Sequence, residues 1–288
     1  MSPAVDCVLD IRATLGEGAI WSVALHRLYF VDIPEGRLHR FDPSSGGHET
    51  WPLGRPLGCV AETETGVIAA LTDGFFHIDL PAGTERRLAG PSPAEYGHRF
   101  NDGTTDPMGR FYAGTMPLAG PSDTPEGVLH VLDRGESRPV MDGFHTINGL
   151  AFAPDGHTAY VSDSYPAVRR IWAYDYAPAT GAWTNRRVFL DTREMPGRPD
   201  GGAVDADGCY WMAGISGWQL VRITPEGKVD RIVEMPVERP TKPMFGGANL
   251  DVLYVTSIGS DAPDALDGSL FAVTGLGVTG VPQARFAG

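Results

Sequence analysis

The chain has 288 residues, of which 42% are hydrophobic, and this is enough to bury a large core. Its formal net charge at pH 7 is −13 and it has no run of Lys or Arg, which argues against nucleic acid or an anionic membrane as a partner. No segment reaches the roughly 18 apolar residues that a membrane span needs, and the first residues do not resemble a signal peptide. We therefore expect a cytoplasmic protein.

The 37 Gly and 24 Pro residues are spread along the whole chain rather than gathered in a linker. This distribution indicates many tight turns within a single domain, residues 1–288. We expect that domain to be a monomer rather than an oligomer. The cysteines Cys7, Cys59 and Cys209 are odd in number and far apart. They are interpreted as small buried apolar residues in a reducing compartment, not as disulfides or zinc ligands.

The first predicted element is a strand within residues 5–12, which stands alone before a series of repeats. A short strand with an aromatic or apolar centre, LYFVDI at 28–33, returns in weakened forms later in the chain. Each copy follows turn residues and precedes a second apolar strand. The later copies lie at 67–74, 110–116, 158–164, 209–215 and 252–258.

The repeats recur at intervals of about 38 to 51 residues, which is the period of a four-stranded propeller blade. Helical periodicity with caps is absent almost everywhere. The sequence therefore predicts an all-β fold, a six-bladed β-propeller in which the strand within residues 5–12 completes the last blade. A β-sandwich or a pair of barrels is the competing fold.

In a propeller the inner strand of every blade lines the central channel, so equivalent positions of the repeats converge. Four of the six inner hairpins carry an oxygen-bearing side chain just before a glycine. The six pairs are Glu17-Gly18, Leu57-Gly58, Asp102-Gly103, Asn148-Gly149, Asp200-Gly201 and Phe245-Gly246. Carboxylates aimed at one point repel each other unless a cation lies between them, and a hard divalent cation prefers oxygen ligands. The alternative is that these are ordinary turn residues, because Asp-Gly and Asn-Gly favour turns.

Several stretches resemble the gluconolactonase/regucalcin (senescence marker protein) family of six-bladed propellers. They are LGEGAIW (15–21), RFNDGTTDPMGRFYAGTM (99–116), INGLAFAPDG (147–156), RPDGGAVDADGCYW (198–211) and TKPMFGG (241–247). Because they extend from the first repeat to the last, the resemblance covers the whole chain. Within the family the chain is most similar in appearance to bacterial pentonolactonases such as xylonolactonase.

The resemblance implies that Glu17, Asn148 and Asp200 bind one divalent metal ion. It also implies that Arg99 and Asn101 face the substrate. Asp102 is assigned to substrate binding with them, as a neighbour of the metal site rather than a ligand. One departure concerns the residues after GTM, where some relatives carry an acidic residue that helps to bind substrate. Here Ala119 falls near that position, and the pattern of hydroxyl groups recognised is expected to differ.

The implied activity is metal-dependent hydrolysis of a sugar aldonolactone, a pentono- or hexonolactone, to the aldonic acid. The metal would polarise the lactone carbonyl and Asp200 would accept a proton from the attacking water. Oxygen ligands admit Ca, Zn, Mg, Mn or Fe(II) as the ion. The alternatives are another metal-dependent ester or phosphotriester hydrolase, or a non-catalytic calcium-binding regulator or scaffold.

Overall fold

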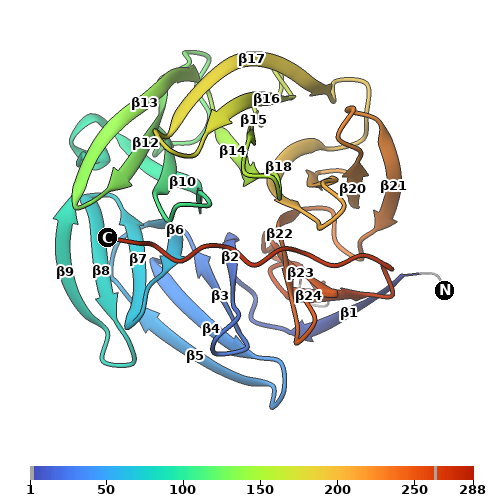
Figure 1. The fold of residues 1–288 in the computed structure, drawn as a ribbon. Coiled ribbons are helices and arrows are strands. Elements are labelled where there is room, and N and C mark those ends of the chain that lie inside the picture. The colour runs from blue at the N-terminus through green and yellow to red at the C-terminus, as the bar shows by residue number, and fades with distance from the viewer. Residues whose placement is uncertain (1–2, 263–264) are drawn as a thin grey trace.

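The computed structural model describes residues 3–262 and 265–288, and its strands form six antiparallel four-stranded sheets arranged in a ring (Figure 1). Within five of the six sheets the strands run from the centre of the ring outward in chain order; in the sixth, the last three strands of the chain are followed by its first strand at the outer edge. The inner strands are buried, as in β6 (Leu57–Glu62), whereas outer strands such as β9 (Thr84–Ala89) are largely exposed. The predicted six-bladed β-propeller is confirmed.

The first three blades follow one another directly in the chain. Blade 1 contains β2 (Gly16–Ser22), β3 (Arg27–Asp32), β4 (Arg37–Asp42) and β5 (Gly47–Pro52); blade 2 contains β6, β7 (Gly66–Leu71), β8 (Gly74–Asp79) and β9; and blade 3 contains β10 (His98–Thr105), β11 (Phe111–Pro117), β12 (Gly127–Asp133) and β13 (Glu136–Phe144).

The last three blades include the one that closes the ring. Blade 4 contains β14 (Ile147–Phe152), β15 (Thr158–Asp163), β16 (Arg170–Ala177) and β17 (Ala182–Asp191); blade 5 contains β18 (Arg198–Val204), β19 (Tyr210–Ile215), β20 (Gln219–Ile223) and β21 (Val229–Glu234); and blade 6 contains β22 (Pro240–Gly246), β23 (Val252–Ser257), β24 (Leu270–Thr274) and β1 (Ala4–Leu9).

The N-terminal strand β1 pairs with β24, with Val5 opposite Val273, so the first strand of the chain is the outermost strand of the last blade. This confirms the predicted closure, although the strand ends at Leu9 rather than at residue 12. Closure joins the first and last strands of the chain in one sheet and thereby holds the ring together. Cys7 lies on this strand and is exposed, contrary to the prediction, because β1 is an outer strand; Cys59 and Cys209 are buried as predicted.

The hydrophobic core is divided into six clusters, one at each interface between neighbouring blades. The cluster between blades 2 and 3, for example, contains Cys59, Ile68, Phe100 and Phe111. Alternation along each strand sends apolar side chains to both faces of a blade, and each face packs against the next blade. The core therefore lies between the blades, around the channel.

The helical structure found in the described residues is one short 3₁₀ segment, Pro93–Tyr96. None of the helices found there has the length and apolar character needed to cross a membrane.

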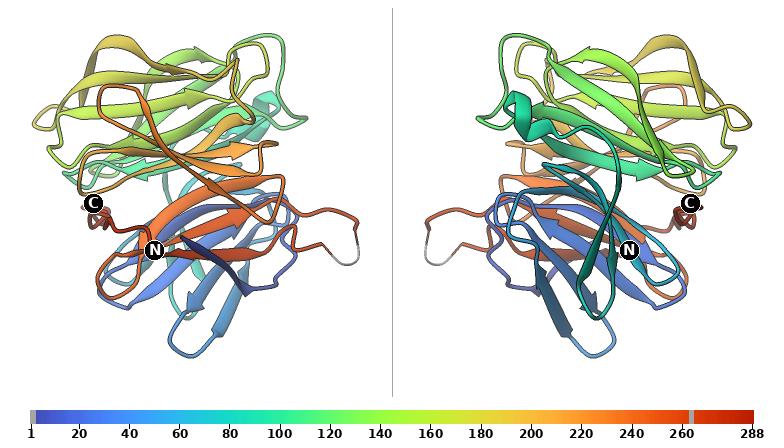
Figure 2. Two further views of the ribbon diagram at one scale, coloured as in Figure 1. Left: turned by 90° about the vertical axis from the view of Figure 1, so that its right-hand side faces the viewer. Right: turned by 90° about the vertical axis from the view of Figure 1, so that its left-hand side faces the viewer.

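The C-terminal segment after β24 crosses the centre of the ring, which the sequence did not predict (Figure 1). Side views place it on one face of the ring (Figure 2). Its contacts reach several blades: the backbone N–H of Gly280 donates to Leu250 O at 2.7 Å, and that of Phe286 donates to Glu62 O at 2.8 Å. The segment therefore covers one end of the channel.

Every inner strand contains a one-residue β-bulge at the same level. In β14, for example, two residues lie between Asn148 and Ala151, whereas one residue lies between their partners Ser162 and Tyr160. The other five bulges fall after Glu17, Leu57, Phe100, Pro199 and Pro240. A bulge bends its strand and redirects the neighbouring side chain, so each blade can point a residue at the axis here.

The glycine after Asn148 is required by its bulge. Gly149 has φ 62°, a left-handed conformation that side chains other than glycine rarely adopt. A Cβ atom there would lie 2.3 Å from the hydroxyl oxygen of Tyr210, which itself donates a hydrogen bond to Gly149 O. The Asn-Gly sequence thus reflects both the backbone of the bulge and the close approach of blade 5.

We expect Gly149→Ala to destabilise the protein by about 2–4 kcal/mol, because it adds a left-handed alanine and a clash with Tyr210. The midpoint of urea unfolding at constant m-value measures the loss. Gly46→Ala is the matched control, since Gly46 has φ 73° and a Cβ atom there would have no other atom within 4 Å. It should cost only about 1–2 kcal/mol; equal losses in both variants would show that packing at Gly149 contributes nothing.

Candidate active site

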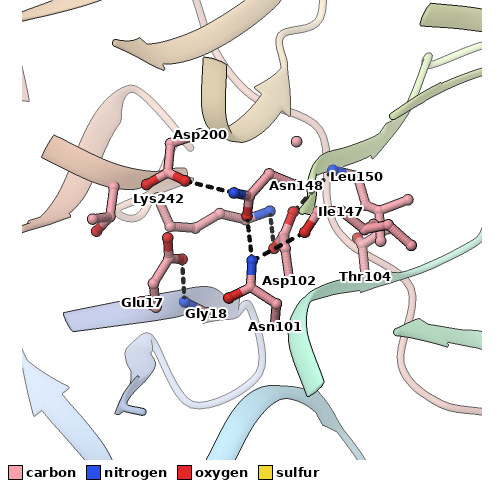
Figure 3. A network of polar contacts seen from close by, with 12 residues as sticks. Glu17, Gly18, Asn101, Asp102, Thr104, Ile147, Asn148, Leu150, Asp200 and Lys242 are labelled. Atoms are coloured by element: carbon pink, nitrogen blue, oxygen red, sulfur yellow. Dashed lines mark hydrogen bonds and ion pairs between the residues drawn. The ribbon is translucent and has the colours of Figure 1, made fainter. Parts of the chain in front are cut away.

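Three of the inner-strand bulges bring oxygen donors to the axis. Glu17 and Asn148 each precede a bulge, and Asp200 is the first residue within the bulge of β18. Their exposed fractions are only 5%, 2% and 6%. The side chains approach one another from blades 1, 4 and 5 (Figure 3). The structure thus brings together the three residues that the sequence analysis assigned to a metal.

Hydrogen bonds fix Asn148 between its neighbours. Its Nδ2 donates to Asp200 Oδ1 at 2.7 Å and to Ser164 Oγ at 2.6 Å, while its Oδ1 accepts from Asn101 Nδ2 at 2.8 Å. Glu17 Oε2 accepts the backbone N–H of Gly18 at 2.9 Å. These hydrogen bonds hold the side chains in place, with the amide nitrogen of Asn148, not its oxygen, toward Asp200.

The two carboxylates are in an unfavourable environment when they are charged. Burial, followed by repulsion from Asp102, raises the pKa of Glu17. Burial, followed by repulsion from Glu17, raises the pKa of Asp200 well above its usual range. Both effects arise because charge is removed from water and placed beside like charge. A cation between Glu17 and Asp200 would relieve both.

A buried lysine, which the sequence analysis missed, lies beside these carboxylates. Lys242 Nζ is 2.9 Å from Asp102 Oδ1, and the two side chains are 2% and 0% exposed. Asp102 Oδ2 also accepts the backbone N–H of Leu150 at 2.9 Å. The pair links blades 6 and 3 across the centre of the ring (Figure 3). Asp102 is thereby neutralised by the protein, whereas Glu17 and Asp200 are not.

The sequence alignment failed in blade 6 because it was based on glycines. It placed Phe245 at the axis, whereas Phe245 belongs to the core between blades 5 and 6 and pairs with Leu253. The bulge of β22 falls earlier, between Pro240 and Pro243, and it contains Lys242. The glycine at position 201 leaves room for the Lys242 side chain, because a Cβ atom there would lie 2.6 Å from Lys242 Cδ.

Arg99 and Asn101 lie next to Asn148, on β10. Arg99 Nη1 donates to Asn101 Oδ1 at 2.7 Å, and Asn101 Nδ2 in turn donates to Asn148 Oδ1 and to the backbone oxygen of Ile147. Burial lowers the pKa of Arg99 to about 10, so its guanidinium is charged at neutral pH. The chain of hydrogen bonds connects these predicted substrate contacts directly to a predicted metal ligand.

These groups line one pocket of about 390 Å³ at the beginning of the inner strands. The charged residues in its wall are Glu17, Asp200, Arg99 and Arg198. Apolar side chains complete the wall, including Met116, Ile215 and Ile258. Asp102, which was expected beside the substrate, does not line this pocket, because its carboxylate is engaged by Lys242.

A second cavity of about 510 Å³ lies toward the ends of the same inner strands. Lys242 and residues 281–284 of the C-terminal segment are among its lining. The Lys242–Asp102 pair therefore lies between the two cavities. The donors described above face the first cavity, away from the C-terminal segment.

The donor set suits a hard divalent cation. Two buried carboxylates supply two negative charges, and an amide supplies a neutral oxygen, which matches the ligand chemistry of calcium, magnesium or manganese. Asn148 presents its nitrogen to Asp200, so binding through Oδ1 requires the amide to turn over. The outline of the side chain would be unchanged, but its nitrogen would then face Asn101 Nδ2, and the hydrogen bond from Asn101 would be lost. Within the described residues, no group of three or more His, Cys, Asp or Glu side chains is arranged to hold a metal; an amide is the third donor here.

Comparison with curated proteins identifies relatives along the full chain. The chain is 39% identical over 297 residues to the 6-deoxy-6-sulfogluconolactonase of Pseudomonas putida, covering 100% of both chains. It is 36% identical over 298 residues to pentonolactonase XacC of Haloferax volcanii, covering 96% of each. Regucalcin of Xenopus laevis is 32% identical over 302 residues, covering 99% of this chain and 98% of the relative.

Solved structures have the same fold. A luciferin-regenerating enzyme superposes with a TM-score of 0.91 at 27% identity, covering 99% of both chains. Regucalcin from Agrobacterium tumefaciens, described as a calcium-binding protein, gives 0.91 at 26% identity, with 98% of this chain and 97% of the other covered. The SMP-30/gluconolactonase/LRE-like family model matches residues 15–259. On these matches the chain belongs to the SMP-30/gluconolactonase/LRE-like family.

Proposed function

We propose that this protein hydrolyses a sugar aldonolactone to the aldonic acid, with one divalent cation held by Glu17, Asn148 and Asp200. The observation that carries the proposal is the composition of the 390 Å³ pocket. There, two unneutralised carboxylates and an amide face the same space as Arg99 and Asn101, which can donate hydrogen bonds to the oxygens of a sugar ring. Two relatives along the full chain are named as lactonases, which supports this reaction.

The relatives' names suggest hexono- and pentonolactones as the substrate range. One is named for a hexonolactone with a sulfonate at C6 and the other for pentonolactones. Both contain a cyclic ester with neighbouring hydroxyl groups. We therefore propose this class of substrate, with the substituents decided by this chain's own pocket.

In the proposed reaction the oxygen of water bonds to the lactone carbonyl carbon, the ring C–O bond breaks, and the ring oxygen leaves as a hydroxyl group. A cation held by Glu17, Asn148 and Asp200 would supply Lewis-acid polarisation of the carbonyl. Asp200 faces the pocket; in its ionised form it accepts a proton from the attacking water and passes that proton to the ring oxygen as the C–O bond breaks. Arg99 and Asn101 donate to ring oxygens and orient the ester.

The primary test is to measure hydrolysis of a panel of pentono- and hexonolactones. The readout is the release of acid at constant pH. Protein stripped with a chelator should be inactive, and Ca, Zn, Mg, Mn or Fe(II) added singly should show which ion restores activity. Hydrolysis that is unaffected by thorough metal removal would contradict the proposed role of the cation. A folded, metal-loaded protein that hydrolyses none of the lactones would contradict the function.

Asp200 and Arg99 should differ in their kinetic effects. Asp200→Asn should lower kcat about 10²–10⁴-fold at saturating metal, because it removes the proposed base while preserving shape. Arg99→Ala should act mainly on KM, since its hydrogen bonds are made in the ground and transition states alike. Steady-state kinetics on one good lactone, with metal affinity measured separately, resolves the two. Near-normal kcat in metal-loaded Asp200→Asn would leave Asp200 as a ligand only.

Glu17→Gln should weaken metal binding and yet stabilise the metal-free protein. Loss of one ligand charge should reduce affinity at least about tenfold. The pKa of Glu17 is raised in the folded state. Its contribution to stability is therefore present below the pKa of Glu in the unfolded chain, near 4.3, and is lost as the pH rises through the pKa of Glu17 in the folded protein. Without metal, the variant should therefore gain about 2–4 °C in Tm at pH 8 and gain little at pH 4.

Calorimetric metal titration and thermal unfolding at the two pH values measure these effects. Glu64→Gln is the control, because Glu64 is an exposed carboxylate outside the pocket. It should change neither quantity. A Glu17→Gln protein that is less stable than the wild type without metal at pH 8 would show that the Glu17 carboxylate is not in an unfavourable environment.

A further inference from the structure

Arg198 is a charged residue of the pocket that the proposed reaction does not use. It is the first residue of β18, two positions before Asp200, and its side chain lines the pocket together with Arg99. The two arginines enter from blades 5 and 3, on either side of Asn148 in blade 4. The pocket therefore holds two guanidinium groups in addition to the donors for a cation.

Neither arginine is paired with a carboxylate. Among the described residues, the ion pairs within 4.0 Å include neither Arg99 nor Arg198, and the buried Arg198 Nε has no hydrogen-bond partner in the protein. Other buried cations that the structure describes, such as Lys242 and Arg110, are paired with carboxylates. Arg222, with its side chain 8% exposed, forms ion pairs of 2.8–2.9 Å with three aspartates, Asp205, Asp207 and Asp230.

The charge balance of the pocket makes the lack of carboxylate partners for Arg99 and Arg198 significant. Glu17 and Asp200 are the acidic residues of its lining, and Arg99 and Arg198 are the basic ones. A divalent cation would neutralise the two carboxylates, so the positive charges of the two arginines would remain. A guanidinium that is partly removed from water and unpaired is costly. A neutral lactone would leave that cost in place, whereas an oxyanion would remove it.

We propose that Arg198, assisted by Arg99, binds an anionic substituent of the substrate, so that the preferred substrate is a sugar lactone that bears a sulfonate, phosphate or carboxylate group. The planar guanidinium fork suits such an oxyanion, to which it can donate two parallel hydrogen bonds. This inference rests on the proposed function, because it names the substrate class of the same pocket. Arg198 acts in binding and takes no part in breaking the ester.

The test compares a matched pair of lactones, glucono-1,5-lactone and its 6-deoxy-6-sulfo derivative, with 6-phosphogluconolactone as a second anion. Wild-type protein should have the higher kcat/KM for the anionic lactones. Arg198→Leu should lower kcat/KM for them about 10–100-fold more than for gluconolactone, mainly through KM, as expected for loss of a charge-assisted hydrogen bond. Arg198→Lys, which keeps the charge but lacks the fork, should recover part of the loss.

A control variant and a binding measurement complete the test. Arg193→Leu removes an exposed arginine paired with Asp191 outside the pocket and should affect both lactones equally. Calorimetry with 6-deoxy-6-sulfogluconate and gluconate should show that Arg198→Leu weakens binding of the sulfonate about 10–100-fold more than binding of gluconate. Arg198→Lys provides the same comparison if the leucine variant does not fold.

The outcomes separate this inference from the proposed function. Equal kcat/KM losses for neutral and anionic lactones, or wild-type protein that binds 6-deoxy-6-sulfogluconate no better than gluconate, would overturn the role of Arg198 while lactone hydrolysis stands. Absence of hydrolysis for every lactone, neutral ones included, would instead overturn the proposed function. Selective loss of the anionic substrates in Arg198→Leu supports both.

Discussion

Burial of charge on the axis of the ring is the constraint on which this site depends. Six inner strands converge there, so a polar side chain at the level of their bulges is both removed from water and close to its counterparts. Three carboxylates lie at this level, those of Glu17, Asp102 and Asp200. Lys242 compensates Asp102 at 2.9 Å. The two carboxylates that remain have raised pKa values for this reason, and they supply the charge that a divalent cation would neutralise.

The fold separates the residues that hold the ring from those that face its axis. Apolar clusters between neighbouring blades provide the packing, and none of them contains Glu17, Asn148 or Asp200. One-residue bulges then present side chains from blades 1, 3, 4, 5 and 6 at the same level, whereas the bulge residue of blade 2 is Gly58. Because the bulge is a backbone feature, an acid, an amide or a lysine can occupy it without repacking the core. This separation is why a stable ring can carry a set of mutually repelling groups.

Strand periodicity was sufficient to predict the number of blades and the closure by the N-terminal strand, because alternation and turn residues are local properties. It did not determine the register at the axis. Asp102 and Asp200 both precede glycines, yet Asp200 is the first residue of its bulge and Asp102 the second. Lys242 was missed because no glycine follows it, and its partner Asp102 lies 140 positions away. The path of the C-terminal segment likewise depends on contacts with distant blades, such as Gly280 with Leu250 and Phe286 with Glu62.

The order of charge along the channel gives the proposed site its direction. Near the cavity lined by the C-terminal segment, Lys242 and Asp102 form a neutral pair. The unneutralised carboxylates follow on the side of the 390 Å³ pocket, and Arg198, which is more exposed than Asp200, lies nearer the solvent. A cation entering from the pocket therefore meets its ligands before it meets Lys242, whose like charge opposes passage farther along the axis. The lysine thus neutralises one carboxylate and also limits the depth at which a cation can bind.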